Sequence, residues 1–224
     1  MTSLTAADKL LYPLVLADAA LFSIGEDRLQ VLLTRRARPP AAGRWALPGG
    51  ILKPSLDGSL EGTALRILRE KVHVDIPYIE QVHTFSGPDR DERGWSLTVL
   101  FYALLPRDRV QAAIGPKVEA VRWADVVEPG VQLAFDHETL LAAAVGALQS
   151  RVLHNALPLH LLPEQFTLTE LQRTCEAVLG RPVDKSAFRR RLRAYEDLVE
   201  VPGQFVRGVQ RPAQLYRARE GFQF

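Results

Sequence analysis

Arginine, glycine and tryptophan residues in the first half of the chain are arranged in a way that suits phosphate recognition. Two arginines end an apolar run, two others lie in a glycine-flanked charged loop, and an Arg-Trp pair precedes a Pro-Gly-Gly turn. A guanidinium fork matches phosphate oxygens, and an indole ring can stack on a purine. We therefore predict a nucleotide-like ligand, bound by these residues and by two residues of the helix after the turn: Arg35, Arg36, Arg44, Trp45, Gly49, Gly50, Arg66, Glu70, Arg90 and Arg93. The alternative for Trp45 is a place in the core, and the alternative for any one of the charged side chains is simple exposure to solvent.

The C-terminal part of the chain is basic. From Arg181 to Phe224, ten Lys and Arg stand against five Asp and Glu, a net charge of +5, whereas the whole chain carries only +2. Such asymmetry indicates a polyanionic partner. The alternative is a solvated basic face with no partner.

The elements that position these residues can be predicted from hydrophobic periodicity. Residues 11–20, 29–34, 78–85 and 96–105 form short apolar or alternating runs bounded by turn residues, which indicates strands. Residues 59–71 have helical spacing and follow the glycine turn. We therefore predict an α+β fold whose first half is a mixed sheet with helices on its faces.

A helix that is apolar on several faces is predicted from Asp136, as the N-cap, to about Arg151. Because such a helix must be buried, it packs either between two domains or between two subunits. We divide the chain after it, into a ligand-sensing domain over residues 1–153 and a DNA-binding domain over residues 154–224.

The second domain has the order of a winged helix-turn-helix. Thr167 and Glu170 form a capping box for a helix that ends at Gly180, and Asp184 caps a helix from Lys185 to about Asp197. That helix has an apolar inner face with Phe188 and Leu192. Arg191 either joins the basic face or pairs internally with Glu196 or Glu176. A hairpin over residues 198–201 and 214–218 follows.

DNA contacts are predicted at the helix N-terminus, along its outer face and at the hairpin tip. Lysine and arginine there can reach guanines in the major groove and backbone phosphates or the minor groove. The residues are Lys185, Ser186, Arg189, Arg190, Arg193, Arg207 and Arg211.

Several classes of protein are disfavoured by composition. The single cysteine, Cys175, permits no disulfide within the chain and has the spacing of a core residue. The five histidines form no metal motif, and no apolar run is long enough to cross a membrane. We expect a cytoplasmic location.

The segment Trp45-Ala-Leu-Pro-Gly-Gly50, followed by a helix with Arg66 and Glu70, resembles the Nudix family. In an active Nudix box, helix glutamates hold a divalent cation that acts on a pyrophosphate. Gly50, Arg66, Leu68, Glu70 and Val74 match the family pattern.

The departures from the pattern remove three of four carboxylates. The position of the first glutamate is Gly58, which follows a spacer two residues longer than usual. Ile67 and Lys71 replace two other glutamates, and His73 replaces a glycine. One carboxylate beside an ammonium group is a poor site for Mg²⁺. We therefore predict that the domain is not an enzyme and uses no cofactor, that Glu70 pairs with Arg66, and that His73 ends the helix.

Over nearly its whole length the chain resembles the Nudix-related transcriptional regulators of the NrtR family. The resemblance is carried by Gly43–Gly50, Leu65–Lys71, Pro77–Gln81, Arg90–Ser96, Leu133–His137, Phe166–Gln172, Gly180–Arg190 and Arg211–Tyr216. It implies a homodimeric repressor of genes of NAD metabolism or related genes, which releases a palindromic operator when ADP-ribose or a related nucleotide binds. Some relatives respond to sugar derivatives instead. The alternatives are a Nudix pyrophosphohydrolase with an accessory C-terminal domain, and an interaction module with neither ligand nor DNA.

Overall fold

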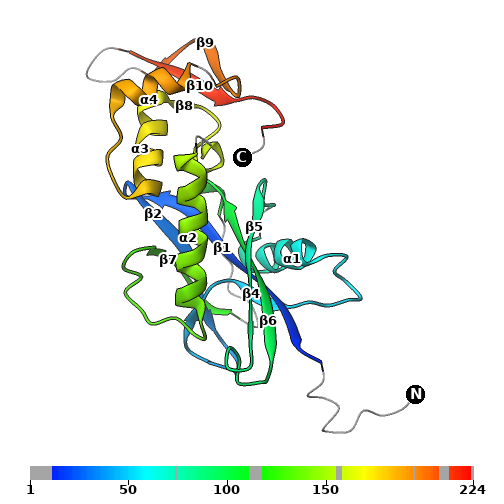
Figure 1. Cartoon of the computed structure of the whole chain (residues 1–224). Helices are drawn as coiled ribbons and strands as arrows, with labels where there is room; N and C mark the ends of the chain where they lie inside the picture. Colours follow the sequence, from blue (N-terminus) through cyan, green and yellow to red (C-terminus); the bar gives the residue numbers. More distant parts are fainter. Residues whose placement is uncertain are drawn as a thin grey trace.

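The computed structural model describes residues 12–73, 75–110, 118–154, 158–193, 195–206 and 212–222. Its main strands and helices are β1 (Leu14–Gly25), β2 (Arg28–Arg36), β3 (Trp45–Ala46), β4 (Gly49–Ile51), α1 (Leu60–Val72), β5 (Ile79–Gly87), β6 (Ser96–Leu104), β7 (Val118–Asp125), α2 (His137–Leu153), β8 (Phe166–Thr167), α3 (Leu168–Leu179), α4 (Lys185–Leu192), β9 (Leu198–Val206) and β10 (Ala213–Ala218). Figure 1 shows the first-half sheet below and the C-terminal helices and hairpin above.

A mixed sheet is built around β1, which pairs in parallel with β6 along its length. On its other edge β1 pairs antiparallel with β4 and then with β2. The order is β3-β2-β1-β6-β5, and β7 pairs with β2. The parallel pairing of β1 with β6 makes the sheet mixed, as predicted.

Alternation along β1 sends its side chains to two apolar layers, because successive residues of a strand face opposite sides of the sheet. Ala19 and Leu21 pack in the layer that includes Ala64 and Leu68 of α1. Ala20 and Phe22 pack on the opposite side, in the layer that includes α2. The sheet therefore lies between α1 and α2, the predicted α/β/α sandwich.

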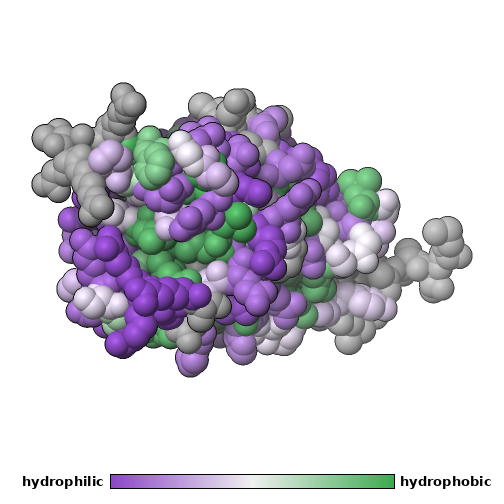
Figure 2. Space-filling view, turned by 90° about the horizontal axis from the view of Figure 1, so that it is seen from above, coloured by the Kyte–Doolittle hydropathy of each residue, from purple (hydrophilic) through white to green (hydrophobic). Residues whose placement is uncertain are grey.

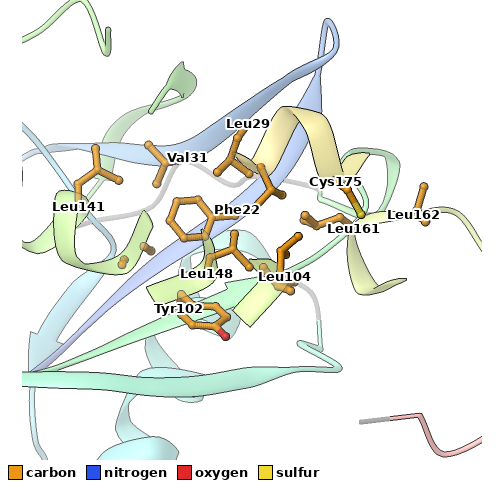
Figure 3. Packing of buried hydrophobic residues seen from close by; sticks show 14 of the residues in the cluster. Phe22, Leu29, Val31, Tyr102, Leu104, Leu141, Leu148, Leu161, Leu162 and Cys175 are labelled. Carbon is orange, nitrogen blue, oxygen red and sulfur yellow. The ribbon is translucent and has the colours of Figure 1, made fainter. Parts of the chain in front are cut away.

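The helix α2 joins the two parts of the molecule. Figure 1 shows it running along the sheet and reaching α3. In Figure 3, Leu141 and Leu148 lie beside Phe22 of β1, and Cys175 of α3 continues the same apolar cluster. The expected burial of this helix is confirmed, since it packs against the sheet and against α3, and Cys175 is a core residue as expected, 1% exposed.

The C-terminal part is a winged helix. Helix α3 begins with the predicted capping box, in which Thr167 and Glu170 bond reciprocally, and its C-cap Gly180 is left-handed with φ 65°. Asp184 caps α4 by accepting a hydrogen bond from the backbone N–H of Ala187 at 2.7 Å. The hairpin β9–β10 packs beside these helices, and β8 pairs with β10.

The predicted elements are confirmed in order and type, with shifted ends. The four predicted strands correspond to β1, β2, β5 and β6, and the predicted helices to α1, α2, α3 and α4. His73 ends α1 with φ 54°, as expected. Among the described residues, no helix combines the length and apolarity that a membrane crossing requires.

Two expectations about these elements need correction, and four strands were not expected. Asp136 makes no capping bond through its side chain, because its carboxylate binds Arg90. Helix α4 ends at Leu192 and not near Asp197, because Leu198 must already pair with Ala218 at the start of β9. The strands β3, β4, β7 and β8 were not predicted; three of them have only two or three residues, too few to show a period.

Replacing Leu148 tests the packing of α2. Leu148 is fully buried, and in Figure 3 it lies near Phe22, Tyr102 and Leu104. We expect Leu148→Ala to lower the free energy of unfolding by about 2–5 kcal/mol, because the lost methyl groups leave a cavity. The measurement is urea denaturation followed by circular dichroism. Leu153→Ala, in the same helix but at a side chain 52% exposed, should change stability by no more than about 0.5 kcal/mol. Equal losses would contradict this packing.

Candidate functional site

A cavity of about 260 Å³ opens where β1, β2, β4, α1, the β5–β6 loop and the start of α2 meet. Among the described residues, seven cationic and three acidic side chains line it. The cationic residues are Arg36, Arg38, Lys53, Arg66, Lys71, Arg90 and Arg93, and the acidic residues are Asp18, Glu70 and Asp91. This excess of positive charge favours an anionic ligand.

Other side chains lie close to both glycines of the Pro-Gly-Gly turn, and at Gly49 the approach leaves no room for a Cβ atom. A Cβ atom on Gly49 would stand 1.6 Å from Oδ1 of Asp18, and one on Gly50 would stand 3.1 Å from Cδ1 of Ile67. Gly49 therefore leaves room for the buried carboxylate of Asp18, which accepts a hydrogen bond from Oγ1 of Thr98 at 2.8 Å. The absence of a side chain at Gly49 therefore shapes the cavity, and no positive φ is involved.

A neutral histidine faces the same carboxylate. Nδ1 of His137 accepts a hydrogen bond from the backbone N–H of Leu47 at 3.0 Å, so the neutral ring carries its proton on Nε2. Nε2 lies 3.8 Å from Oδ1 of Asp18. Burial lowers the pKa of His137, against the opposing attraction of Asp18. Neither Asp18 nor His137 was predicted as a site residue; the nearest signal was Asp18 interrupting an otherwise apolar strand.

The carboxylates along α1 are held by Arg66. Its Nε and Nη2 atoms donate to the two oxygens of Asp57 at 2.6 and 2.8 Å, and Nη1 donates to Oε1 of Glu70 at 3.2 Å. Asp57 is 1% exposed and also accepts from the backbone N–H of Lys53 and the hydroxyl of Thr63. The predicted pairing of Glu70 with Arg66 is confirmed. Asp57 was missed because it stands one residue before the expected position, Gly58.

The pKa of Asp57 lies well below its usual range, chiefly because its carboxylate accepts hydrogen bonds from Arg66. The same bonds raise the pKa of Arg66. Burial opposes both shifts, yet the bidentate geometry outweighs it. The pair therefore stays ionised at neutral pH and fixes the loop before α1 onto the helix.

The described residues do not fit a divalent cation. Lys71, at the position of a missing Nudix carboxylate, donates from Nζ to the carbonyl oxygen of Gly49 at 3.2 Å. Within the described ranges, no group of three or more His, Cys, Asp or Glu residues is placed to hold a metal ion. An ammonium group among the possible ligands repels a cation, so we derive no chemistry through Mg²⁺ here.

The arginine-rich loop between β5 and β6 closes one side of the cavity. Arg93 binds Asp91 through two contacts at 2.8 and 2.6 Å, and those hydrogen bonds are the main reason that the pKa of Asp91 is lowered. Arg90 donates two hydrogen bonds to Asp136 at 2.7 and 2.9 Å. Arg90 thus connects the cavity to the first turn of α2.

Seven of the ten predicted ligand-binding residues line the cavity, and Arg35, Arg44 and Trp45 do not. Arg35 follows the alternation of β2 to the opposite side from Arg36, where it donates to the carbonyl of Gly43 at 3.0 Å. Arg44 donates to the carbonyl of Leu133 at 2.9 Å, and Trp45 packs half-buried beneath Arg122. The residues inside the cavity are Arg36, Gly49, Gly50, Arg66, Glu70, Arg90 and Arg93.

The second predicted surface lies on α4. Phe188 and Leu192 are buried beneath it, 2% and 6% exposed, as predicted for the inner face. The predicted contact residues that the structure describes are all exposed: Lys185, Ser186, Arg189, Arg190 and Arg193. Arg207 and Arg211 lie outside the described residues. Figure 2 looks down on this end of the molecule, where hydrophilic side chains border an apolar area.

Arg191 differs from its neighbours because it lies half-buried on α4, with its guanidinium 5.4 Å from the centre of the Phe188 ring. The acids predicted as its partners have other contacts. Glu196 pairs with Arg219 at 3.6 Å, and Glu176 accepts from the backbone N–H of Val183 at 2.9 Å. Arg191 therefore lies on the half-buried side of α4 and not on its exposed basic face.

Fold and site together define a class of protein in which a Nudix domain is joined to a DNA-binding winged helix. The family model of the NUDIX domain matches residues 15–143, and that of the NrtR DNA-binding winged helix domain matches residues 158–218. An Acinetobacter baylyi protein named ADPR responsive transcriptional repressor NtrR is 42% identical over 92% of this chain and 82% of its own. The chain belongs to the NrtR family of Nudix-related transcriptional regulators.

Two solved structures of Shewanella oneidensis NrtR are similar to this chain. The one complexed with a 27mer DNA is 38% identical, covers 92% of this chain and 93% of its own, and has a TM-score of 0.82. The NUDIX domain complexed with ADP ribose is 39% identical, covers 64% of this chain and 99% of its own, and has a TM-score of 0.57.

The ion pair of Asp57 should make stability depend on pH in acid. Because the pKa is lowered in the folded chain, its contribution is complete above the unfolded value of about 3.9 and declines as pH falls towards the folded value. We expect Asp57→Asn to lower the urea midpoint at pH 7 and the difference from the unmodified chain to shrink below about pH 4. Asp75→Asn, which removes an exposed partner of Arg69, is the control and should have little effect. A difference that is constant with pH would refute this role of Asp57.

Proposed function

We propose that this protein is a transcriptional repressor that binds operator DNA through α4 and the hairpin, and releases it when ADP-ribose occupies the Nudix cavity. The observation that carries this proposal is the direct connection, through α2, of a cation-lined cavity to a winged helix with an exposed basic helix. The names of the relatives, one responsive to ADPR and one complexed with DNA, support the same function.

The cavity suits a ligand that carries a diphosphate and a ribose, such as ADP-ribose. Arg36, Lys53 and Arg93 are cations from three different segments around it, so phosphates can be contacted from several sides. Asp18 and Asp91 supply carboxylates that can accept hydrogen bonds from ribose hydroxyls. We infer that these residues bind ADP-ribose without hydrolysing it. Mg²⁺-dependent turnover of ADP-ribose would instead favour a pyrophosphohydrolase.

DNA recognition is assigned to the exposed face of α4. A helix fits the major groove, where arginine forms bidentate hydrogen bonds with guanine. Arg189 and Arg190 are the central residues of this face, and Arg207 and Arg211 remain predicted phosphate contacts of the wing. We further propose a homodimer on a palindromic operator in the cytoplasm, controlling genes of NAD metabolism, since one recognition helix reads only a half-site.

Coupling between the two sites follows the path of α2. Its first turn holds Asp136, the partner of Arg90 at the cavity, and its last turns pack on α3. An anionic ligand that binds Arg90 competes with Asp136 and changes how the start of α2 is held. Such competition favours one arrangement over another, which is the requirement for a ligand to shift an equilibrium.

Removing the carboxylate of Asp136 tests this coupling. We expect Asp136→Asn to raise the affinity for ADP-ribose, because the ligand then has no competitor for Arg90. Since ligand and operator oppose each other in this proposal, the affinity for the operator should fall. Each change should be roughly fivefold or more. Isothermal titration calorimetry and fluorescence anisotropy give the two affinities. Asp75→Asn, at an exposed site elsewhere in the same domain, is the control. If both affinities are unchanged in Asp136→Asn, the path runs elsewhere.

The double variant Arg189→Ala with Arg190→Ala tests the DNA surface. Two lost contacts at about 1–3 kcal/mol each should remove specific operator binding and leave ADP-ribose affinity intact. The measurement is fluorescence anisotropy with labelled DNA from upstream of the protein's own gene, at moderate salt. Arg28→Ala with Arg69→Ala is the matched control, since it removes two exposed arginines from the Nudix domain.

The same titration tests the function as a whole. The expected result is that the unmodified protein binds this DNA tightly and that ADP-ribose reverses the binding. Tight binding that is indifferent to ADP-ribose would keep the repressor and reject this effector, which would turn attention to sugar derivatives and other nucleotides. Operator binding retained by the double variant would contradict the assignment of α4.

A further inference from the structure

We propose that the ammonium group of Lys71 takes the place of the divalent cation of a Nudix site, so that the diphosphate of the effector binds without Mg²⁺. This inference rests on the proposed function, because it concerns how the same cavity receives its ligand. Specifically, Lys71 is a cation fixed on α1, and its ammonium group binds the diphosphate.

The oxygens that could ligate a metal on this side of the cavity are bound by protein cations. Both oxygens of Asp57 accept from Arg66, and Glu70 accepts from the same guanidinium. A divalent cation prefers several oxygens that it can gather around itself. To recruit these two carboxylates it would have to displace Arg66, whose pair with Asp57 is buried. Breaking that pair is costly because it leaves a charge uncompensated.

Lys71 binds a backbone oxygen of the glycine turn. Its Nζ is 3.2 Å from the carbonyl oxygen of Gly49, and the same glycine lies against Asp18 deep in the cavity. The ammonium is therefore held at the mouth of the glycine turn, between α1 and β4. Lys71 lines the cavity from the helix face that in an active Nudix box carries carboxylates.

An ammonium can perform the electrostatic part of the metal's task. It carries a full positive charge and three N–H donors, so one donor can hold a carbonyl while another meets a phosphate oxygen. It cannot activate a bound water as a metal does. A lysine at this position therefore favours retention of the ligand over its hydrolysis, as a sensor requires.

The test compares binding with and without metal in the full chain. ADP-ribose and inorganic pyrophosphate are each titrated calorimetrically into the unmodified protein in EDTA and in Mg²⁺. We expect equal affinities in the two buffers. Lys71→Met should weaken binding about tenfold or more in both, since a charged hydrogen bond is lost. Lys71→Glu should lose binding in EDTA and in Mg²⁺ alike, because it adds a charge of the ligand's own sign while Arg66 still holds the carboxylates of Asp57 and Glu70.

Arg69→Met is the matched control, because Arg69 lies on the same helix with its side chain 66% exposed and outside the cavity lining. Its affinity should equal that of the unmodified chain. Circular dichroism and urea denaturation establish that each variant is folded. A variant that does not fold is replaced by Lys71→Gln, which keeps a polar end group and removes the charge.

Failure of this inference and failure of the proposed function give different results. Binding by the unmodified chain that disappears in EDTA, or a Lys71→Met affinity equal to that of the control, would overturn the role of Lys71. Pyrophosphate binding that depends on Lys71, without any binding of ADP-ribose, would support the lysine and reject ADP-ribose as effector. No binding of either compound in either buffer would overturn both.

Discussion

The apolar surface of α2 is divided between two partners, the sheet on one side and α3 on the other. Leu141 and Leu148 belong to the same buried cluster as Phe22 of the sheet and Cys175 of α3. Burial of this surface stabilises both parts at once, because apolar area removed from water contributes wherever it is covered. The polar bond from Nε2 of Gln149 to the carbonyl of Val178, at 3.1 Å, fixes the same contact. The same helix therefore packs directly on both the sheet and α3.

Charge in the cavity is arranged by fixed protein cations. Arg66 binds the carboxylates that α1 and its preceding loop supply, and Lys71 binds the carbonyl of Gly49. Both cations are held by hydrogen bonds to other parts of the chain, so their positions are set before a ligand arrives, which limits the ordering cost of binding. The acidic residues that remain in the lining, Asp18 and Asp91, are each bonded to a neighbour. The result is a cavity lined by fixed cations, in a Nudix domain whose described residues do not fit a divalent cation.

Two different constraints act on α4. Phe188 and Leu192 anchor its inner face in the core that α2 and α3 share, while its outer face consists of exposed basic side chains. The anchored face gives the helix a defined orientation, and the exposed face is left for a partner. Arg191 lies over the Phe188 ring and belongs structurally to the first group. Recognition and packing are thus separated within two turns of helix.

The sequence alone determined the periodic elements and their caps, because these depend on residues a few positions apart. The capping box of Thr167 and Glu170, the left-handed Gly180 and the inner face of α4 all follow from local spacing. It also indicated the loss of Nudix carboxylates.

Only the tertiary structure decided which arginines share a cavity, since strand alternation separates Arg35 from Arg36 and a contact over 46 residues pairs Arg90 with Asp136. It likewise brought Asp57 to Arg66 and Asp18 to His137. Such pairings depend on where the chain returns to itself, and no local pattern of residues encodes that.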